Sequence, residues 1–203
     1  MRYLHILLLA VLSTFAYANF ESNVSHEGWV TKDGKPVPNT DNMKSIKGFG
    51  GWLIITPDQD WAEKWETPSH TTPYFSEEKE VEYGKKLTIL TFFINPLVDK
   101  QGNVNITCGI KIIRPNNTVS IDNQNIGCVN GKFPGNPRSV YLSPVVIKYS
   151  GDAGDPPGKW RVEVSITDKN RDAYVPLKSQ FTLVKKANKR VKSDAQKDAR
   201  ALP

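Results

Sequence analysis

Side chains that bind metals or act as nucleophiles are scarce in this sequence. Its 203 residues include only three histidines and two cysteines. Neither His26 nor His70 has a second histidine or a cysteine at the spacing that zinc ligands use. The sequence also has no Gly-x-Ser-x-Gly turn, no phosphate-binding loop and no dinucleotide fingerprint. We therefore expect no catalytic residues, no metal site and no cofactor.

Long apolar segments are also missing beyond the N-terminus. The apolar stretch 4–16 is too short to cross ~30 Å of hydrocarbon at ~1.5 Å per residue. Arg2 precedes this stretch, and Ala16-Tyr17-Ala18 follows the small-x-small pattern of a cleavage site. We therefore predict that residues 1–18 are a signal peptide, that the chain has no membrane span, and that it is periplasmic or secreted.

The two cysteines, Cys108 and Cys128, both follow the predicted cleavage site. An even number of cysteines in an oxidising compartment is typical of a disulfide. We expect these two to be bonded, with Cα atoms ~4.4–6.8 Å apart.

The net charge of +6 gives little indication of a nucleic-acid partner. Arg2 contributes one of these charges, and residues 185–203 contribute five, so residues 19–184 carry no net charge. A neutral body lacks the basic surface that nucleic-acid binding requires. Residues 185–203 contain few apolar side chains, which predicts a disordered basic tail.

Residues 19–48 are polar and rich in turn-forming residues, so we expect an irregular N-terminal arm. One short helix is expected next, with Thr56 as its N-cap and Pro57 as its first residue. Short apolar or alternating segments fill much of the region 49–184, and turn signals separate them. They predict strands at 49–56, 81–83, 87–94, 104–112, 118–121, 127–129, 140–149, 160–166 and 174–184.

Strands without alternating helices predict an all-β fold rather than a parallel α/β sheet. Two antiparallel sheets packed face to face satisfy the pattern best, with one apolar and one polar face on each strand. Pro144 lies inside the expected strand 140–149 and predicts an edge or bulged strand there.

The segment DPPGKWRVEVSITD resembles the end of immunoglobulin-like and macroglobulin-like sandwich domains, with Gly158, Trp160, Val162 and Val164 at the matching places. The segment VEYGKKLTILTFF is similar to their opening. The resemblance covers about residues 78–184 and implies an immunoglobulin-like β-sandwich. The cysteine pair departs from the pattern, because antibody domains bridge a different pair of strands.

Four aromatic residues form the candidate binding site: Trp61, Trp65, Tyr74 and Phe75. Trp61 and Trp65 share one face of the expected helix because they are four residues apart. Such rings can anchor a protein partner or stack on sugar rings. The alternative is that they seal one end of the sandwich core.

These features favour an exported, non-catalytic immunoglobulin-like module that acts in protein binding or as an accessory factor in the periplasm. A carbohydrate-binding protein with an aromatic platform is the alternative. A small hydrolase with a dispersed carboxylate pair ranks lowest. Asp152 and Asp155 could bind calcium, although both residue types are common in ordinary turns.

Overall fold

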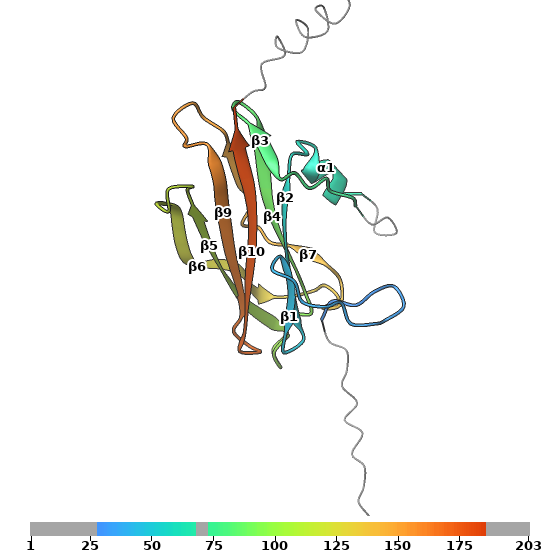
Figure 1. Ribbon diagram of the computed structural model, residues 1–203. Coiled ribbons are helices and arrows are strands. Elements are labelled where there is room, and N and C mark those ends of the chain that lie inside the picture. Colours follow the sequence, from blue (N-terminus) through green and yellow to red (C-terminus); the bar gives the residue numbers. More distant parts are fainter. Residues whose placement is uncertain (1–27, 68–72, 186–203) are drawn as a thin grey trace, which may run out of the picture.

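The computed structural model describes residues 28–67 and 73–185 (Figure 1). The predicted signal peptide, residues 186–203 of the predicted tail, His26 and His70 lie outside the described residues. The described part contains one short helix, α1 (Trp61–Trp65), and ten strands. The strands are β1 (Met43–Ile46), β2 (Phe49–Thr56), β3 (Glu80–Glu82), β4 (Lys86–Ile94), β5 (Asn103–Ile113), β6 (Val119–Lys132), β7 (Tyr141–Leu142), β8 (Ile147–Ser150), β9 (Gly158–Asp168) and β10 (Ala173–Val184).

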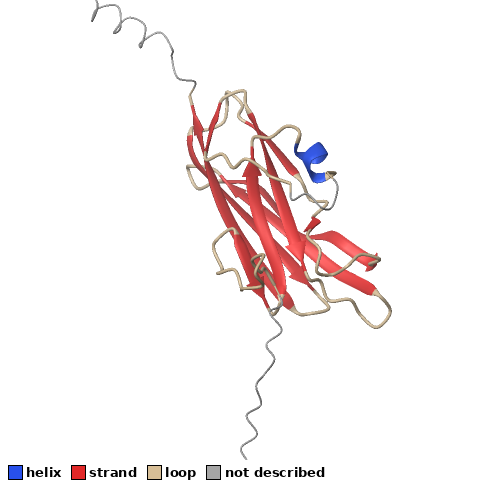
Figure 2. Cartoon of the chain, turned by 90° about the vertical axis from the view of Figure 1, so that its right-hand side faces the viewer, coloured by secondary structure: helices blue, strands red, loops and turns tan. Residues whose placement is uncertain are grey.

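The strands form two five-stranded sheets that pack face to face, as Figure 2 shows in side view. Sheet I has the order β1-β2-β4-β7, and β8 also pairs with β4. Sheet II has the order β3-β10-β9-β5-β6. The predicted all-β sandwich is therefore confirmed. The expectation of purely antiparallel sheets is wrong at one place, because β3 runs parallel to the end of β10, with Val81 opposite Leu183.

Three local predictions differ from the structure. The arm 19–48 is not wholly irregular, because it contains β1, which pairs with β2. The expected strand 140–149 is interrupted between β7 and β8, where Pro144 has no N–H to donate. The two short strands expected at 118–121 and 127–129 are parts of the single strand β6. β6 is mostly exposed, so it shows no apolar period by which sequence analysis could find it.

The pairing of β5 with β6 shifts register three times. At each shift, β6 contains an extra residue. At the first shift, Ile106 pairs with Val129 and Thr107 pairs with Gly127. Cys128 is therefore the extra residue of β6 at this position. Cys128 forms the predicted disulfide with Cys108 on β5, and their Cα atoms are 5.7 Å apart. The disulfide therefore joins two neighbouring strands of one sheet at a β-bulge.

The main core lies between the two sheets. Its largest fully buried side chains include Trp160, Phe181, Phe49 and Phe93. Trp160 and Phe181 stack with their ring planes 9° apart, and Tyr149 from β8 packs 4.7 Å from the Phe181 ring. Burying each such side chain stabilises the fold by about 1.5–3 kcal/mol.

A second apolar cluster lies on the outer face of sheet I, around Ile54, Phe75, Leu90 and Phe92. Nearly every residue of β2 and β4 is consequently buried. The expectation of one polar face on each strand is wrong for these two strands. Their unbroken apolar sequences are typical of strands that are covered on both sides.

Gly50 and Gly51 allow β2 to be covered on both faces. A Cβ on Gly51 would lie 3.1 Å from the side chains of Leu177 and Val175 on sheet II. A Cβ on Gly50 would lie 2.8 Å from the indole nitrogen of Trp29 on the opposite face. The two glycines therefore let sheet II approach one face of β2 and an indole ring approach the other.

One buried carboxylate joins the loops at one end of the sandwich. Asp168 is fully buried at the end of β9. Its Oδ2 accepts a hydrogen bond from Leu97 N at 2.7 Å, and its Oδ1 accepts from Asn170 N and Arg171 N at 3.1 and 3.2 Å. The Arg171 guanidinium donates onward to the carbonyl oxygens of Lys47 and Asn95. Asp168 and Arg171 therefore connect the β1–β2 and β9–β10 hairpins with the β4–β5 loop.

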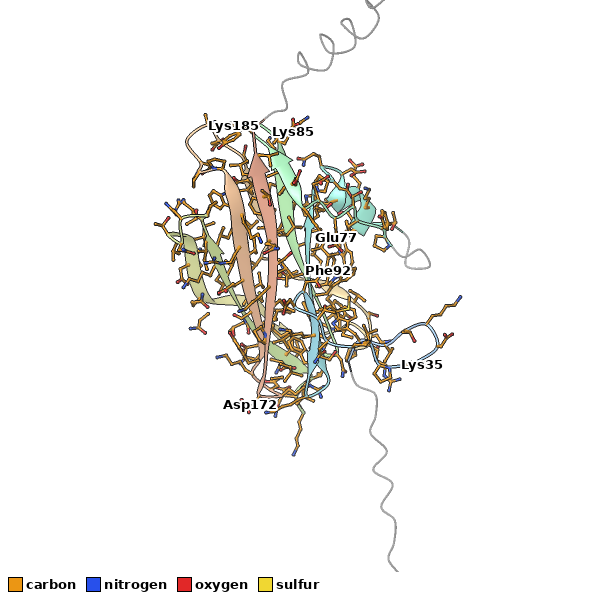
Figure 3. All side chains as sticks on the ribbon, in the orientation of Figure 1. Lys35, Glu77, Lys85, Phe92, Asp172 and Lys185 are labelled. Carbon is orange, nitrogen blue, oxygen red and sulfur yellow. A yellow bond between two sulfur atoms is a disulfide. The ribbon has the colours of Figure 1, made fainter. Side chains whose placement is uncertain are left out.

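We expect Asp168→Ala to lower the free energy of unfolding by about 3–5 kcal/mol, because it removes one partner of a buried ion pair and leaves three N–H groups unsatisfied. Chemical denaturation followed by tryptophan fluorescence measures this loss. Asp172→Asn is the matched control. Asp172 lies at the exposed tip of the β9–β10 hairpin (Figure 3), where its ion pair with Lys47 is open to solvent. The control should leave the unfolding midpoint unchanged, and equal losses for both variants would contradict the assignment.

Candidate functional site

An aromatic layer covers the outer face of sheet I. Phe92 on β4 is at its centre, with the rings of Trp65, Phe75 and Trp52 at centroid distances of 5.3, 5.6 and 5.6 Å. Trp29 meets Trp52 edge to face at 6.1 Å, and its indole N–H donates to the Gly51 carbonyl at 3.0 Å. We call this group the aromatic cap; it consists of Trp29, Trp52, Trp61, Trp65, Phe75 and Phe92.

The structure separates the four predicted site residues. Phe75 is only 7% exposed, and Trp61 and Trp65 pack partly buried against the same cluster. Tyr74 is 79% exposed and does not belong to this cluster. The rings of α1 thus pack against a buried cluster, but this cluster covers the outer face of sheet I and does not seal the end of the main core as the alternative interpretation expected. A binding role for the four residues stays a prediction.

Helix α1 starts later than expected. It begins after Asp60, whereas Thr56 and Pro57 precede the helix. The Thr56 hydroxyl instead accepts a hydrogen bond from Asp58 N at 3.1 Å and closes a short turn. This turn places the carboxylate of Asp58 beneath the helix.

Asp58 fastens α1 to the segment that follows it. Its Oδ2 accepts a hydrogen bond from Lys64 Nζ at 2.7 Å and another from Ser76 N at 2.9 Å. The side chain of Asp58 is only 11% exposed. Burial raises the pKa of this carboxyl, but the hydrogen bonds from Lys64 and Ser76 outweigh it, so the pKa of Asp58 lies below its ordinary value of 3.8.

The outer face of sheet II differs from that of sheet I. Figure 1 shows α1 beside β2, on the far side of the sandwich from β6. Four charged side chains of alternating sign cross sheet II in one row, from β10 to β6: Lys178, Glu163, Lys111 and Asp122. Lys178 lies 3.7 Å from Glu163, and Lys111 lies 3.4 Å from Asp122. We call this row the charge ladder.

A hollow of about 320 Å³ lies beside the charge ladder. Gly109 lies in its floor, where a Cβ would come within 2.6 Å of the Ser165 hydroxyl oxygen. Ser165 on β9 and Pro176 on β10 lie in one cross-strand row with Gly109. Tyr174, which is 57% exposed, lines one side of the hollow. Sequence analysis missed this hollow. Its members are far apart in the chain and meet only through strand register.

A larger groove of about 770 Å³ follows the edge of β10. The strands of sheet II contribute Lys159, Arg161 and Lys178 to it. The segments that connect the two sheets contribute Asp41, Glu77 and Glu78. Sequence analysis did not predict this groove.

The turn that contains Asp152 and Asp155 is held by internal hydrogen bonds. Asp155 Oδ2 accepts from the Tyr149 hydroxyl at 3.1 Å and from Asp152 N at 3.3 Å. Burial, reinforced by Asp155, raises the pKa of Tyr149 well above its ordinary value. No group of three or more His, Cys, Asp or Glu side chains within residues 28–67 and 73–185 is arranged to hold a metal ion. No helix in this part of the chain is long and apolar enough to cross a membrane.

We expect the attachment of α1 to depend on pH through Asp58. A carboxyl whose pKa is lowered on folding stabilises the fold above its unfolded pKa of about 3.9, and this stability is lost as pH falls through the lower folded pKa. Asp58→Asn should loosen α1 at neutral pH by on the order of 2 kcal/mol, which is typical of a charged hydrogen bond.

Amide hydrogen exchange of residues 61–66 between pH 6 and pH 3 measures both effects. The wild-type chain should lose protection at the acid end, beyond the intrinsic change in exchange rate, whereas Asp58→Asn should show low protection throughout. Glu63→Gln, an exposed change on the same helix, serves as the control. The same protection profile in the wild type and in Asp58→Asn would show that this carboxylate does not hold the helix.

Comparisons with known structures find only weak structural similarity. No protein-family model and no curated protein matches the sequence. A family 123 glycoside hydrolase from Clostridium perfringens aligns with 68% of this chain at 11% identity and a TM-score of 0.40, and the chain spans only 27% of that enzyme. A CARDB domain from Pyrococcus furiosus aligns at 9% identity and a TM-score of 0.33, with 66% of this chain and 89% of that domain covered. An immunoglobulin-like protein from Pseudomonas aeruginosa aligns at 12% identity and a TM-score of 0.29, with 70% and 95% covered. Similarities at this level carry no argument about function.

Proposed function

We propose that this chain is an exported, non-catalytic immunoglobulin-like module that binds another protein in the periplasm or outside the cell. The disulfide between Cys108 and Cys128 supports an oxidising compartment. The N-terminal sequence, with its cleavage pattern at Ala16-Tyr17-Ala18, supports export. The non-catalytic part of the proposal rests on the sequence, which offers no recognisable nucleophile and base.

Strand order supports the immunoglobulin-like part of the proposal. The order β10-β9-β5-β6 in sheet II corresponds to strands G, F, C and C′ of a variable-type immunoglobulin sandwich. In sheet I, the pairing of β4 with β7 and β8 corresponds to that of strands B and E. Two features depart from that fold. The disulfide lies within one sheet, and β1 and β2 extend the other sheet.

The protein-binding function is supported mainly by the difference between the two outer faces of the sandwich, one of which is apolar and covered while the other is charged and open. The aromatic cap covers sheet I, whereas the described residues leave the charge ladder on sheet II open to solvent. The two ion pairs of the ladder are 3.4 and 3.7 Å long and solvent-accessible, so Lys178, Glu163 and Lys111 can exchange their neighbours for charges on a partner. Asp122 is held more firmly, because it also accepts a hydrogen bond from Gln124 at 2.7 Å. Charges arranged in this way favour specificity and register in protein association.

Two exposed tyrosines provide a direct test. A photo-crosslinking benzophenone amino acid replaces either Tyr174 on sheet II or Tyr74 near the aromatic cap, in the full chain expressed in its native host. We expect a discrete crosslinked adduct with another protein from position 174, and none from position 74. Glu163→Lys, which places three positive charges side by side in the ladder, should reduce the adduct at position 174 severalfold. Equal adducts from both tyrosines, or none from position 174, would contradict the proposal.

Carbohydrate binding is the second candidate, and the hollow at Gly109 is the observation that favours it. An exposed tyrosine ring, that of Tyr174, stands beside hydrogen-bonding groups of Gln124 and Ser165. Sugar rings are bound by this combination of an aromatic face and polar side chains. The tryptophans of the aromatic cap lack this openness.

A glycan array followed by titration calorimetry tests the second candidate. If a glycan binds, Tyr174→Ala should weaken it about tenfold, equivalent to ~1.4 kcal/mol, because the stacking face is lost. Tyr174→Phe keeps the face and should bind as the wild type does. Gly109→Ala should also weaken binding because its Cβ enters the hollow. An array without any bound glycan, or binding that survives Tyr174→Ala, would rule out this site.

A further inference from the structure

The outer edge of β10 is only partly occupied by other segments of the chain. β10 pairs with β9 from Ala173 to Leu183, but it pairs with β3 only at its last three residues. Before β3 begins, two separate backbone hydrogen bonds reach this edge. Lys178 N donates to the Asp41 carbonyl, and Thr182 N donates to the Lys79 carbonyl, both at 2.7 Å.

Gln180 lies midway between these two bonds. In an antiparallel pair, successive residues direct their N–H and C=O groups alternately toward and away from the partner strand. Because Lys178 and Thr182 point away from β9 and the pairing with β9 has no register shift, Gln180 points away from β9 too. Among the described residues, no backbone group bonds to Gln180 on that side. One donor and one acceptor of a β-sheet therefore face the groove.

The groove over this edge has an apolar floor and charged sides. Its floor includes Ile55 and Phe181, which are 3% and 1% exposed. Arg161, directly opposite Gln180 on β9, and Lys178 lie on the same outer face of sheet II as the Gln180 side chain. The gap between the bonds at Lys178 and Thr182 spans ~13 Å at ~3.3 Å per residue. This distance accommodates about three residues of an extended chain.

We propose that the groove binds a short extended segment of a partner protein, one residue of which forms a β-bridge with Gln180. The bridging residue accepts a hydrogen bond from Gln180 N–H and donates its own N–H to the Gln180 carbonyl. This inference rests on the proposed protein-binding function and specifies how the partner is recognised. Addition of an extended segment to an open sheet edge is a general mode of peptide recognition.

The positions of charge and apolar surface predict the sequence of the segment. The side chain of the bridging residue shares the outer face with Gln180. It lies diagonal to Lys178 and within reach of the long Arg161 side chain one strand beyond Gln180, so an acidic residue fits there. The residues before and after it point inward, toward Ile55 and Phe181, so apolar side chains fit at those positions. The expected motif is apolar–acidic–apolar in extended conformation.

A peptide titration tests the motif. The probe is acetyl-Gly-Val-Glu-Val-Gly-amide, added to the ¹⁵N-labelled, oxidised protein and followed by NMR. We expect saturable shifts of the Gln180 amide and its neighbours, with weak affinity typical of so short a peptide. The same peptide with lysine in place of glutamate should bind at least fivefold more weakly. A peptide that is N-methylated at the glutamate cannot donate to the Gln180 carbonyl and should bind about tenfold more weakly.

Two variants of the protein complete the test. Gln180→Pro removes the N–H that faces the groove and leaves the ladder with β9 intact, and Pro176 already occupies an equivalent edge position on the same strand. This variant should lose the peptide, whereas Gln180→Ala should bind as the wild type does. Peptide binding unaffected by N-methylation or by Gln180→Pro, or no binding at all, would overturn the inference. A crosslinked partner at position 174 would still support protein binding in that case, so the two failures are distinguishable.

Discussion

The burial of β2 and β4 on both faces is the constraint on which the rest of this structure depends. A sandwich of two sheets normally leaves each sheet with a solvated outer face. Here the aromatic cap forms a third layer over sheet I, centred on Phe92. Gly50 and Gly51 make this arrangement possible. Without a Cβ, Gly50 leaves room for the Trp29 ring on one face of β2, and Gly51 leaves room for side chains of sheet II on the other. The third layer removes the outer face of sheet I from contact with solvent and leaves that of sheet II as the open one.

The third layer also explains why α1 is fastened by charge. A helix of five residues cannot form stably by itself, so it depends on tertiary contacts. The Trp65 ring packs on Phe92, and Trp61 packs against the same cluster. The Asp58 carboxylate links Lys64 of the helix to Ser76 in the following segment. At the far end of the sandwich, Asp168 joins the β9–β10 hairpin to the β4–β5 loop in the same way. Each end is therefore organised by one carboxylate that several donors satisfy.

Sequence patterns predicted the fold better than the site. The strand at Phe49–Thr56 was predicted with its observed bounds, and the disulfide followed from the two cysteines alone. The apolar sequence of β4 contained a signal of double burial, because it lacks the alternation that one-sided burial produces. Exposed β6 carried no apolar period, and its true length was missed for that reason. Strand register brings together Gly109, Ser165 and Tyr174 at the hollow. The short β3 leaves the outer edge of β10 open at Gln180. Neither feature has a local sequence signal.

The three bulges of β6 have a consequence for solubility. A long outermost strand is a template on which a second copy could add its own strand, and repeated addition leads to aggregation. β6 spans Val119–Lys132 and has only Asp122 and Lys132 as charged residues, so charge gives it little protection. The extra residues break its hydrogen-bonding pattern at three places, and one of these is fixed by the Cys108–Cys128 bond. Oxidation therefore holds in place an irregularity that discourages self-association of the molecule through this edge.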